Sequence, residues 1–198
     1  MKLPIVQYGD PVLRAKGALI EKIDDRIREL AQNMIETMHE ANGVGLAAQQ
    51  IGEAIQLAVI DVSQVEDRPS TMNLNGQEVD PARTMPLILV NPEVDAGNET
   101  EIGIEGCLSF PEITGDIPRS TSIVVHAQDL DGNLVKIETA GFLARAIQHE
   151  VDHLNGVLFI DRMSSAAKIS LSSKLKRLQK ETQRGLKHRQ RAVAETTL

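Results

Sequence analysis

Apolar residues recur every three to four positions over residues 24–41, a spacing that places them on one face of a helix. Asp24 or Asp25 is suited to cap the amino end, and Asn42–Gly43 is a typical stop signal. The segment therefore predicts an amphipathic helix that buries one face in a core. That face consists of Ile27, Leu30, Ala31, Met34, Ile35 and Met38.

The same spacing predicts two further helices. One covers residues 142–154 and ends near Asn155–Gly156, where glycine commonly terminates a helix. The other covers about residues 165–191, where Gly185 weakens the pattern. The apolar positions of this last helix are Leu171, Leu175 and Leu178.

Four segments rich in β-branched residues predict strands instead of helices. They are residues 55–62, 86–94, 121–130 and 133–140. The last two flank a typical hairpin turn around Asp131-Gly132-Asn133, so we expect them to pair with each other. Between the first two strands, the polar residues 63–84 include several Pro, Asn and Gly, which predicts a long surface loop with little structure of its own.

Helices and strands in this order predict an α+β fold. We expect antiparallel β-sheets around the central helix of residues 142–154, with the amphipathic helix before them and a basic helix at the C-terminal end. A length of 198 residues and a hydrophobic content of 41% suit one domain with one core. We expect a catalytic domain over residues 1–164, followed over residues 165–198 by a basic helix and tail that do not form an independent domain.

Composition argues against two kinds of partner. Three Phe, one Tyr and no Trp leave few rings to stack on bases, which argues against sequence-specific nucleic-acid binding. Pro4, Gly9 and Pro11 interrupt the start before the apolar core of a signal peptide could form, and no later apolar run approaches the length of a membrane span. We therefore expect a cytoplasmic protein of the bacterial type that does not bind membranes.

The net charge of -7 is unevenly distributed. Residues 162–198 carry ten Lys or Arg and two Glu, so this end has a charge of +8 and the remainder of the chain has -15. A basic helix is commonly a solvated surface, but charge segregation of this extent also suits docking on an anionic surface such as RNA.

The segment "QHEVDHL", residues 148–154, contains the spacing H-E-x-x-H. His149 and His153 lie four positions apart on one helical face and can bind one metal ion, while Glu150 beside them is free to act as a base. Proteases with the extended form of this motif have a third histidine at the position of Phe159. The remaining metal ligand must therefore come from elsewhere in the chain.

Cys107 is the single cysteine of the chain and cannot form an internal disulfide. By itself it would equally suit a small buried apolar residue. Its segment "EGCLSFP" does not resemble a core strand, because Gly106 allows close backbone approach and Pro111 ends the segment. Together with His149 and His153 it would provide three ligands and leave a fourth coordination position open, as in catalytic sites.

A third segment, "GVGLAAQQIG" at residues 43–52, follows the first predicted helix. Its glycines would expose backbone to an extended ligand, and a glutamine amide there could donate to an oxyanion. The alternative is a helix stop followed by a tightly packed turn.

The segments "GVGLAAQQ", "EGCLS" and "QHEVDHL", in this order, resemble the three motifs of the peptide deformylases, and "YGDPVLR" at residues 8–14 resembles the opening of that family. The resemblance covers about residues 3–165 and implies that the chain removes the N-formyl group from nascent formyl-methionyl peptides. It also implies one divalent ion per chain. Iron(II) is the ion expected in cells, and zinc, nickel or cobalt are those expected in preparations.

The family's site residues can be carried onto matching positions of this sequence. The resemblance implies that Cys107, His149 and His153 bind the metal and that Glu150 is the general base. It implies further that the Gln50 side-chain amide and the Leu108 backbone N–H stabilise the oxyanion.

The substrate's methionine requires an apolar pocket on the amino-terminal side of His149 on the same helix. We expect the stem of Arg145 to line it while the charge of Arg145 reaches solvent. Backbone beyond the methionine is expected to pair like an added strand, and Glu105 and Arg119 are expected to form an ion pair beside the Cys107 loop. The expected substrate-binding residues are Gly43, Val44, Gly45, Ile104, Gly106, Phe142, Arg145 and Ala146.

Two other functions compete with this one. A zinc endopeptidase would need a third ligand downstream, where the nearest glutamate, Glu181, lies in the basic end without a supporting motif. A structural metal module would need a fourth protein ligand, which the surroundings of His39, His126 and His188 do not suggest. Because nascent chains leave the ribosome amino end first, we also expect the basic helix to dock the enzyme on the ribosome.

Overall fold

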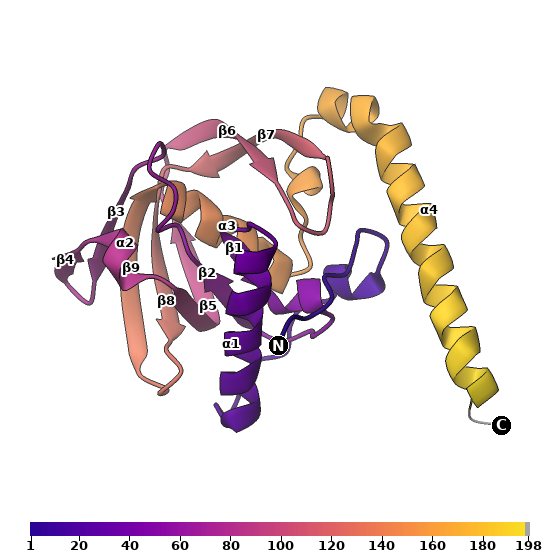
Figure 1. The fold of residues 1–198 in the computed structure, drawn as a ribbon. Helices are drawn as coiled ribbons and strands as arrows, with labels where there is room; N and C mark the ends of the chain where they lie inside the picture. Colours follow the sequence, from indigo (N-terminus) through magenta and orange to yellow (C-terminus); the bar gives the residue numbers. More distant parts are fainter. Residues whose placement is uncertain (197–198) are drawn as a thin grey trace.

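The computed structural model describes the backbone of residues 1–196 and the side chains of residues 1–188. Residues 197–198, the end of the expected basic tail, lie outside the described residues. The helix α3 (Phe142–Leu154) runs through the middle of the molecule, between a large sheet and a β-hairpin (Figure 1). The helix α1 (Asp25–Glu40) covers the outside of the sheet, and α4 (Ser165–Thr196) lies apart from it.

The large sheet has seven strands, and every neighbouring pair is antiparallel. A separate two-stranded sheet pairs β6 (Thr100–Gly106) with β7 (Thr114–Ser120). The predicted mixture of helices with antiparallel sheets is confirmed. In spatial order the large sheet consists of β1 (Gly45–Ala47), β2 (Leu57–Ile60), β5 (Leu87–Ala96), β8 (Ser122–Gln128), β9 (Leu134–Gly141), β3 (Ser70–Leu74) and β4 (Gln77–Val79).

The strand β2 is buried on both faces, because successive side chains point to opposite sides of a sheet. Leu57 and Val59 pack in the core that α1 covers, whereas Ala58 and Ile60 pack in the core that α3 covers. The sheet is therefore sandwiched between these two helices where β2 lies. Asp24 caps α1, because its carboxylate accepts from the backbone N–H of Ile27 at 3.1 Å.

The four predicted strands are present as β2, β5, β8 and β9, and the predicted hairpin joins β8 to β9. The strands β1, β6 and β7 were not predicted. Their segments are short or contain glycine and proline, and β6 exposes most of its side chains, so that they lack the apolar pattern of a core strand.

The prediction of a long unstructured loop over residues 63–84 is wrong. This segment contains β3, β4 and the short helix α2 (Pro81–Thr84), and β3 pairs with β9 in the large sheet. Asn75 and Gly76 both have positive φ, at 52° and 87°, and form the two-residue turn of a β-hairpin. The polar residues that suggested a loop lie on the exposed side of that hairpin, and only Met72 is fully buried.

The start of α3 is held by this same segment. The backbone N–H of Phe142 donates to the Pro69 carbonyl at 3.3 Å, and that of Leu143 donates to the Ser70 hydroxyl at 2.9 Å. Gly141 makes the approach feasible, because a Cβ at this position would lie 2.3 Å from the Pro69 oxygen. The amino end of α3 is therefore capped by residues about seventy positions earlier in the chain.

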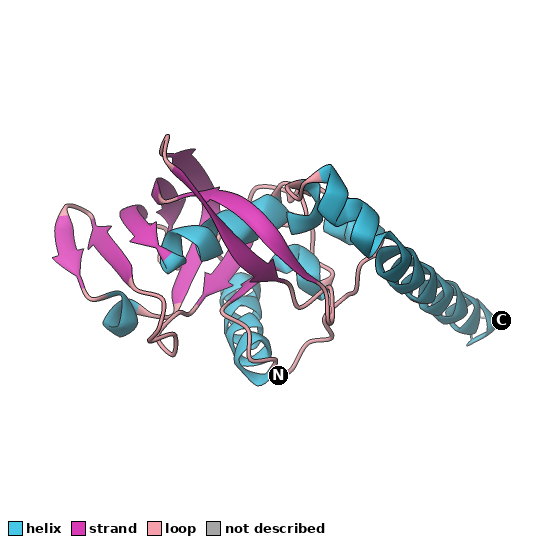
Figure 2. Cartoon of the chain, turned by 90° about the horizontal axis from the view of Figure 1, so that it is seen from above, coloured by secondary structure: helices cyan, strands magenta, loops and turns pink. Residues whose placement is uncertain are grey.

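The helix α4 continues through Gly185 to Thr196, beyond the predicted end near residue 191. Leu171, Leu175 and Leu178 pack partly against the amino-terminal segment, where Tyr8 and Val12 contribute to the same cluster. The helix then extends away from the sheets (Figure 2). Among the described residues, no helix has both the length and the apolar character needed to cross a membrane. The remaining short 3-10 helices are Pro11–Arg14, Ala48–Ile51 and Phe159–Asp161.

Candidate metal centre

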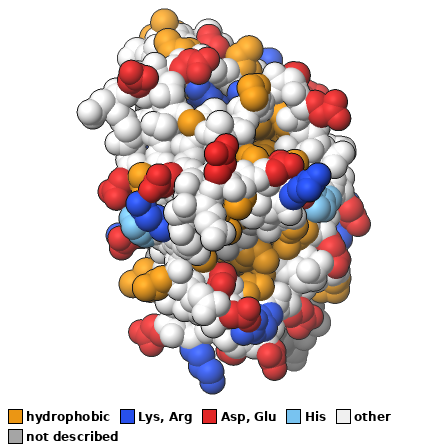
Figure 3. Space-filling view, turned by 90° about the vertical axis from the view of Figure 1, so that its left-hand side faces the viewer, with side chains coloured by type: hydrophobic (Ala, Val, Ile, Leu, Met, Phe, Trp, Pro, Cys, Tyr) orange, Lys and Arg blue, Asp and Glu red, His pale blue; other side chains and the backbone are white. Residues whose placement is uncertain are grey.

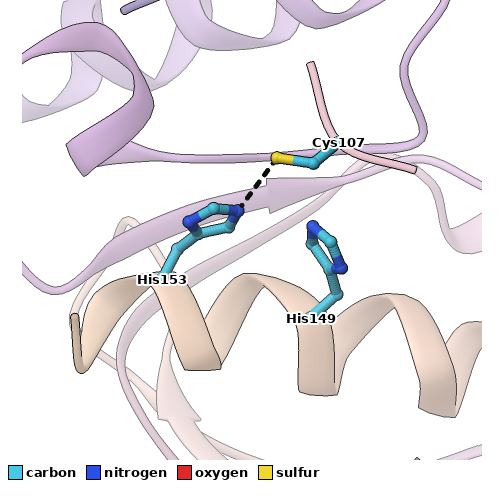
Figure 4. Close-up of side chains that lie close together, drawn as sticks. All are labelled: Cys107, His149 and His153. Atoms are coloured by element: carbon cyan, nitrogen blue, oxygen red, sulfur yellow. Dashed lines mark hydrogen bonds between the residues drawn. The ribbon is translucent and has the colours of Figure 1, made fainter. Parts of the chain in front are cut away.

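Cys107, His149 and His153 converge on one point (Figure 4). Cys107 directly follows β6, and the two histidines project from α3 one turn apart. Their sulfur and nitrogen atoms all lie within 4.8 Å of one another, and the Cys107 Sγ lies 3.3 Å from the His153 Nε2. The single thiol of the chain therefore lies close to both helical histidines.

The donor set and its surroundings suit a divalent transition metal. Glu105 Oε2 lies 2.9 Å from the Nδ1 of His149, which leaves the Nε2 of His149 to face the metal position. Burial would lower the pKa of His149, but its interactions with the nearby Cys107 and Glu105 side chains outweigh that effect and raise the pKa. Burial and the neighbouring His149 lower the pKa of His153, which favours the neutral imidazole that metal binding requires. The site thus stabilises positive charge between a thiol and two imidazoles.

Glu105 is buried and accepts hydrogen bonds from several side chains, on the side of His149 that faces away from the metal position. Its carboxylate accepts from Arg119 at 2.9 Å through two N–H groups and from Arg145 at 2.9 Å. Burial alone would raise the pKa of Glu105, but the hydrogen bonds from Arg119 and His149 lower it to about 2. The expected pair of Glu105 and Arg119 is present, and Asp152 and Arg162 extend it.

The expectation that the charge of Arg145 reaches solvent is wrong. Its side chain is 9% exposed. The guanidinium donates to Glu105 and to the backbone carbonyls of Glu101 and Ile117, so that its charge is neutralised and its donors are satisfied inside the protein. Arg145 therefore ties α3 to both strands of the β6–β7 hairpin.

Gln50 and Gln49 face in different directions. The Oε1 of Gln50 accepts from the Ala47 N–H at 2.9 Å, and its Nε2 lies 3.4 Å from both the Cys107 Sγ and the Ser109 hydroxyl. Gln49 instead donates to the Leu154 carbonyl at 3.2 Å in the core. Of the two amides, only that of Gln50 lies at the metal centre.

Phe159 occupies the position where the extended protease motif would have histidine. Its ring lies 6.0 Å from that of His149 and packs edge-on against Phe110 at 5.1 Å. Phe159 is 1% exposed, so it supports the site as core packing.

A pocket of about 470 Å³ opens beside the three residues. All eight expected substrate-binding residues line it, as do Gln50, Leu108, Cys107, His149 and Glu150. Glu150 is buried, its Oε2 has no hydrogen-bond partner among the described residues, and burial raises the pKa of Glu150 to about 7. The lining residues that sequence reasoning missed are Asn42, Arg68, Phe110, Pro111, Glu112, Ile113 and Thr114.

Gly45 lies directly against Glu150. A Cβ at Gly45 would lie 2.3 Å from the Glu150 Oε1 and 2.8 Å from its Cγ, so Gly45→Ala must displace the Glu150 side chain. Misplacement on this scale is expected to lower turnover by about 10- to 100-fold while the protein still binds metal. Turnover and metal content of the purified variant test this, with Gly185→Ala as control because no atom lies near an added Cβ there. Normal turnover in Gly45→Ala would show that Glu150 can shift without consequence.

The chain is similar over nearly its whole length to known proteins. A family model described as Polypeptide deformylase matches residues 2–168. The peptide deformylase of Opitutus terrae is 47% identical over 94% of this chain and 98% of its own, and that of Methylacidiphilum infernorum is 45% identical over 91% and 94%. A plant peptide deformylase crystal structure, 34% identical over 92% of each chain, has a TM-score of 0.80.

The extent of these matches leaves little of the chain outside them, and the family model ends at residue 168, close to the start of α4. The structure places the three motif segments around one pocket, and the relatives match across all of them. This chain belongs to the polypeptide deformylase family, whose members are metal-dependent hydrolases that remove the formyl group from N-formylmethionine peptides.

Proposed function

We propose that this chain carries out the family's reaction at the centre formed by Cys107, His149 and His153, which would hold one divalent ion. The observation that carries the proposal is the convergence of these three residues within 4.8 Å beside a pocket of about 470 Å³. Three protein ligands leave a coordination position for water or substrate, as catalytic sites require.

Glu150 moves the proton in this proposal. When bound, the ion acidifies a water molecule and polarises the formyl carbonyl. Glu150 accepts a proton from the attacking water and returns it to the amine that leaves. Its unpartnered Oε2 supports this role, because that oxygen is free to accept a hydrogen bond.

Two donors would stabilise the oxyanion that forms on the formyl oxygen. The Gln50 Nε2 is aimed at the Cys107 side of the pocket, because the Ala47 N–H holds the other end of the amide. The backbone N–H of Leu108 is the second proposed donor.

The apolar wall of the pocket suits a methionine side chain. Phe142 and Ala146 provide this wall on α3, with Val44 among the lining residues. Beyond the methionine, the peptide backbone would pair with Gly43–Gly45 on one side and Ile104–Gly106 on the other. This is compatible with the sheets, because in the described part of the chain β1 pairs only with β2 and β6 only with β7.

We propose iron(II) as the ion in cells. A site of one thiolate and two imidazoles also accepts zinc, nickel and cobalt, and relative affinity alone would not select iron. Metal analysis of protein purified without oxygen tests this point, and zinc as the sole metal under those conditions would contradict it.

The assay that tests the reaction measures free amine released from formyl-Met-Ala. A protein substrate that carries no formyl group is measured in parallel. Release of amine from the first and no cleavage of the second is expected. Cleavage of the unformylated protein would instead indicate an endopeptidase, and metal binding without either reaction would indicate a structural module.

We further propose that residues 165–198 belong to the same domain as residues 1–164 and dock the enzyme on the ribosome. Leu175 and Leu178 pack on the body together with Tyr8 and Val12, which supports one unit. The exposed part of α4 carries basic side chains, which would contact an anionic surface. Those that are exposed are Lys174, Lys176, Arg177, Lys180, Arg184 and Lys187.

Reversal of three of these charges tests the docking. Truncation after Ser173 would also remove leucines that pack on the body, so the substitutions Lys176→Glu, Arg177→Glu and Lys180→Glu separate charge from folding. We expect unchanged hydrolysis of formyl-Met-Ala but lost co-sedimentation with ribosomes at low salt, because phosphate contacts depend on basic charge. Equal co-sedimentation of this variant and the parent protein would leave α4 as a solvated helix.

A further inference from the structure

Arg68 lies at the rim of the pocket on the loop between β2 and β3. Its guanidinium carbon is 3.9 Å from the centre of the Phe142 ring, and both residues line the pocket. Phe142 is the proposed wall for the first side chain of the substrate. Arg68 therefore lies where the substrate residues after the methionine would pass.

The other arginines of the body have carboxylate partners, whereas Arg68 has none among the described residues. Asp67, Glu99 and Glu101 line a neighbouring pocket with Arg68, but none forms an ion pair with it within 4.0 Å. The arginines of described ion pairs are Arg14, Arg26, Arg28, Arg83, Arg119, Arg145, Arg162 and Arg177.

The remaining charged residues of the pocket have other roles or positions. Glu105 and Arg145 neutralise each other in the interior, and His149 and Glu150 belong to the metal centre. Glu112 is exposed on the loop after Cys107. Arg68 is thus the one cation of the described pocket lining whose charge is not matched by a protein carboxylate.

The backbone of Arg68 is held against α3. Its neighbours Pro69 and Ser70 accept hydrogen bonds from the first two N–H groups of the helix, so the loop and the Phe142 wall form one unit. The Arg68 guanidinium lies over the Phe142 ring, and its N–H groups donate to no described residue, so that they are available to a ligand. Such a group is well arranged to bind a carboxylate.

A cation at the rim of the pocket is opposite in sign to the net charge of the body. On the face opposite α4, hydrophobic side chains gather in a hollow that acidic side chains flank more often than basic ones (Figure 3). Residues 1–161 carry a net charge of -15, so an acidic peptide meets repulsion over most of the body. Arg68, a single cation at the rim of the pocket, would attract a carboxylate there and offset that repulsion locally.

We propose that Arg68 selects substrates by binding a carboxylate side chain at the first or second residue after the formyl-methionine. The inference rests on the proposed function, since it names which formyl-methionyl peptides the same pocket favours. Arg68 acts on binding of the downstream residues and has no part in the proton transfer at Glu150.

The test compares peptide amides, so that no terminal carboxylate competes for Arg68. Formyl-Met-Glu-Ala-Ala-amide and formyl-Met-Ala-Glu-Ala-amide are each compared with the peptide in which lysine replaces glutamate. At low salt we expect a kcat/KM ratio of acidic to basic peptide of about two to five for at least one position, as for a partly exposed charge pair. The ratio should approach one at high salt.

Three variants give the control and the reversal. Arg68→Met should bring the ratio to one or below and Arg68→Glu should lower it further, an outcome that loss of packing cannot produce. Arg83→Met is the matched control, because Arg83 lies on α2 outside the pocket with its side chain 89% exposed. Equal ratios in the parent protein and both Arg68 variants would overturn the inference while leaving deformylation intact. Failure to hydrolyse any of the peptides would instead contradict the proposed function.

Discussion

Cys107→Ala is expected to abolish both metal binding and hydrolysis of formyl-Met-Ala. The thiol is the one proposed ligand that does not come from α3, and it lies 3.3 Å from the His153 Nε2. Without it, two imidazoles on one helical face remain, which is too few for a stable catalytic site. His149→Ala and His153→Ala should have the same effect, and metal content and amine release should fall together in all three variants.

His126→Ala is the control for these variants, because His126 is an exposed histidine on β8 that does not line the pocket. It should keep the metal content and turnover of the parent protein. A crystal structure at full metal occupancy in which Cys107 points away from the ion would contradict the proposed ligand set.

Glu150→Gln should separate metal binding from chemistry. Glutamine keeps the size of the side chain but cannot accept a proton, so turnover is expected to fall by about 10²-fold or more while the metal content stays at the level of the parent protein. The Michaelis constant should change little, because Glu150 does not contribute to the proposed methionine wall. Metal analysis and steady-state kinetics on the same preparation measure these quantities.

The control for this variant is Glu181→Gln, which makes the same chemical change on the exposed surface of α4. Near-normal turnover in Glu150→Gln would exclude Glu150 as the general base. Loss of metal from that variant would show that the carboxylate also supports the ligands, and the comparison with Gly45→Ala would then decide how much of the effect is steric.

Local spacing was sufficient to find the residues that meet at the metal centre. His149 and His153 are one helical turn apart, so their proximity follows from the helix alone. Cys107 could be added because no other thiol exists in the chain. The turn at Asn75–Gly76 is also readable from the sequence, but the polar residues around it are typical of a loop and obscure its two strands.

Features that depend on distant partners could not be read from the sequence. Arg145 is buried because Glu105 and two backbone carbonyls of the β6–β7 hairpin neutralise and satisfy it. The start of α3 has no cap of its own, and Pro69 and Ser70 provide one only after β3 has joined the sheet. In both cases the partner is brought close only by the tertiary structure, and the neighbouring sequence gives no signal for it.

The two edges of the large sheet have opposite consequences for contacts with other chains. At one edge, β4 has three residues, and it exposes Gln77 and Glu78. A short, charged edge strand is a poor template for another molecule's strand, so the sheet resists edge-to-edge aggregation at high protein concentration. At the other edge, Gly45 of β1 lines the pocket, where the proposed substrate backbone would pair. Both edge strands are thus only three residues long, and in the proposed function the β1 edge receives the end of one extended peptide.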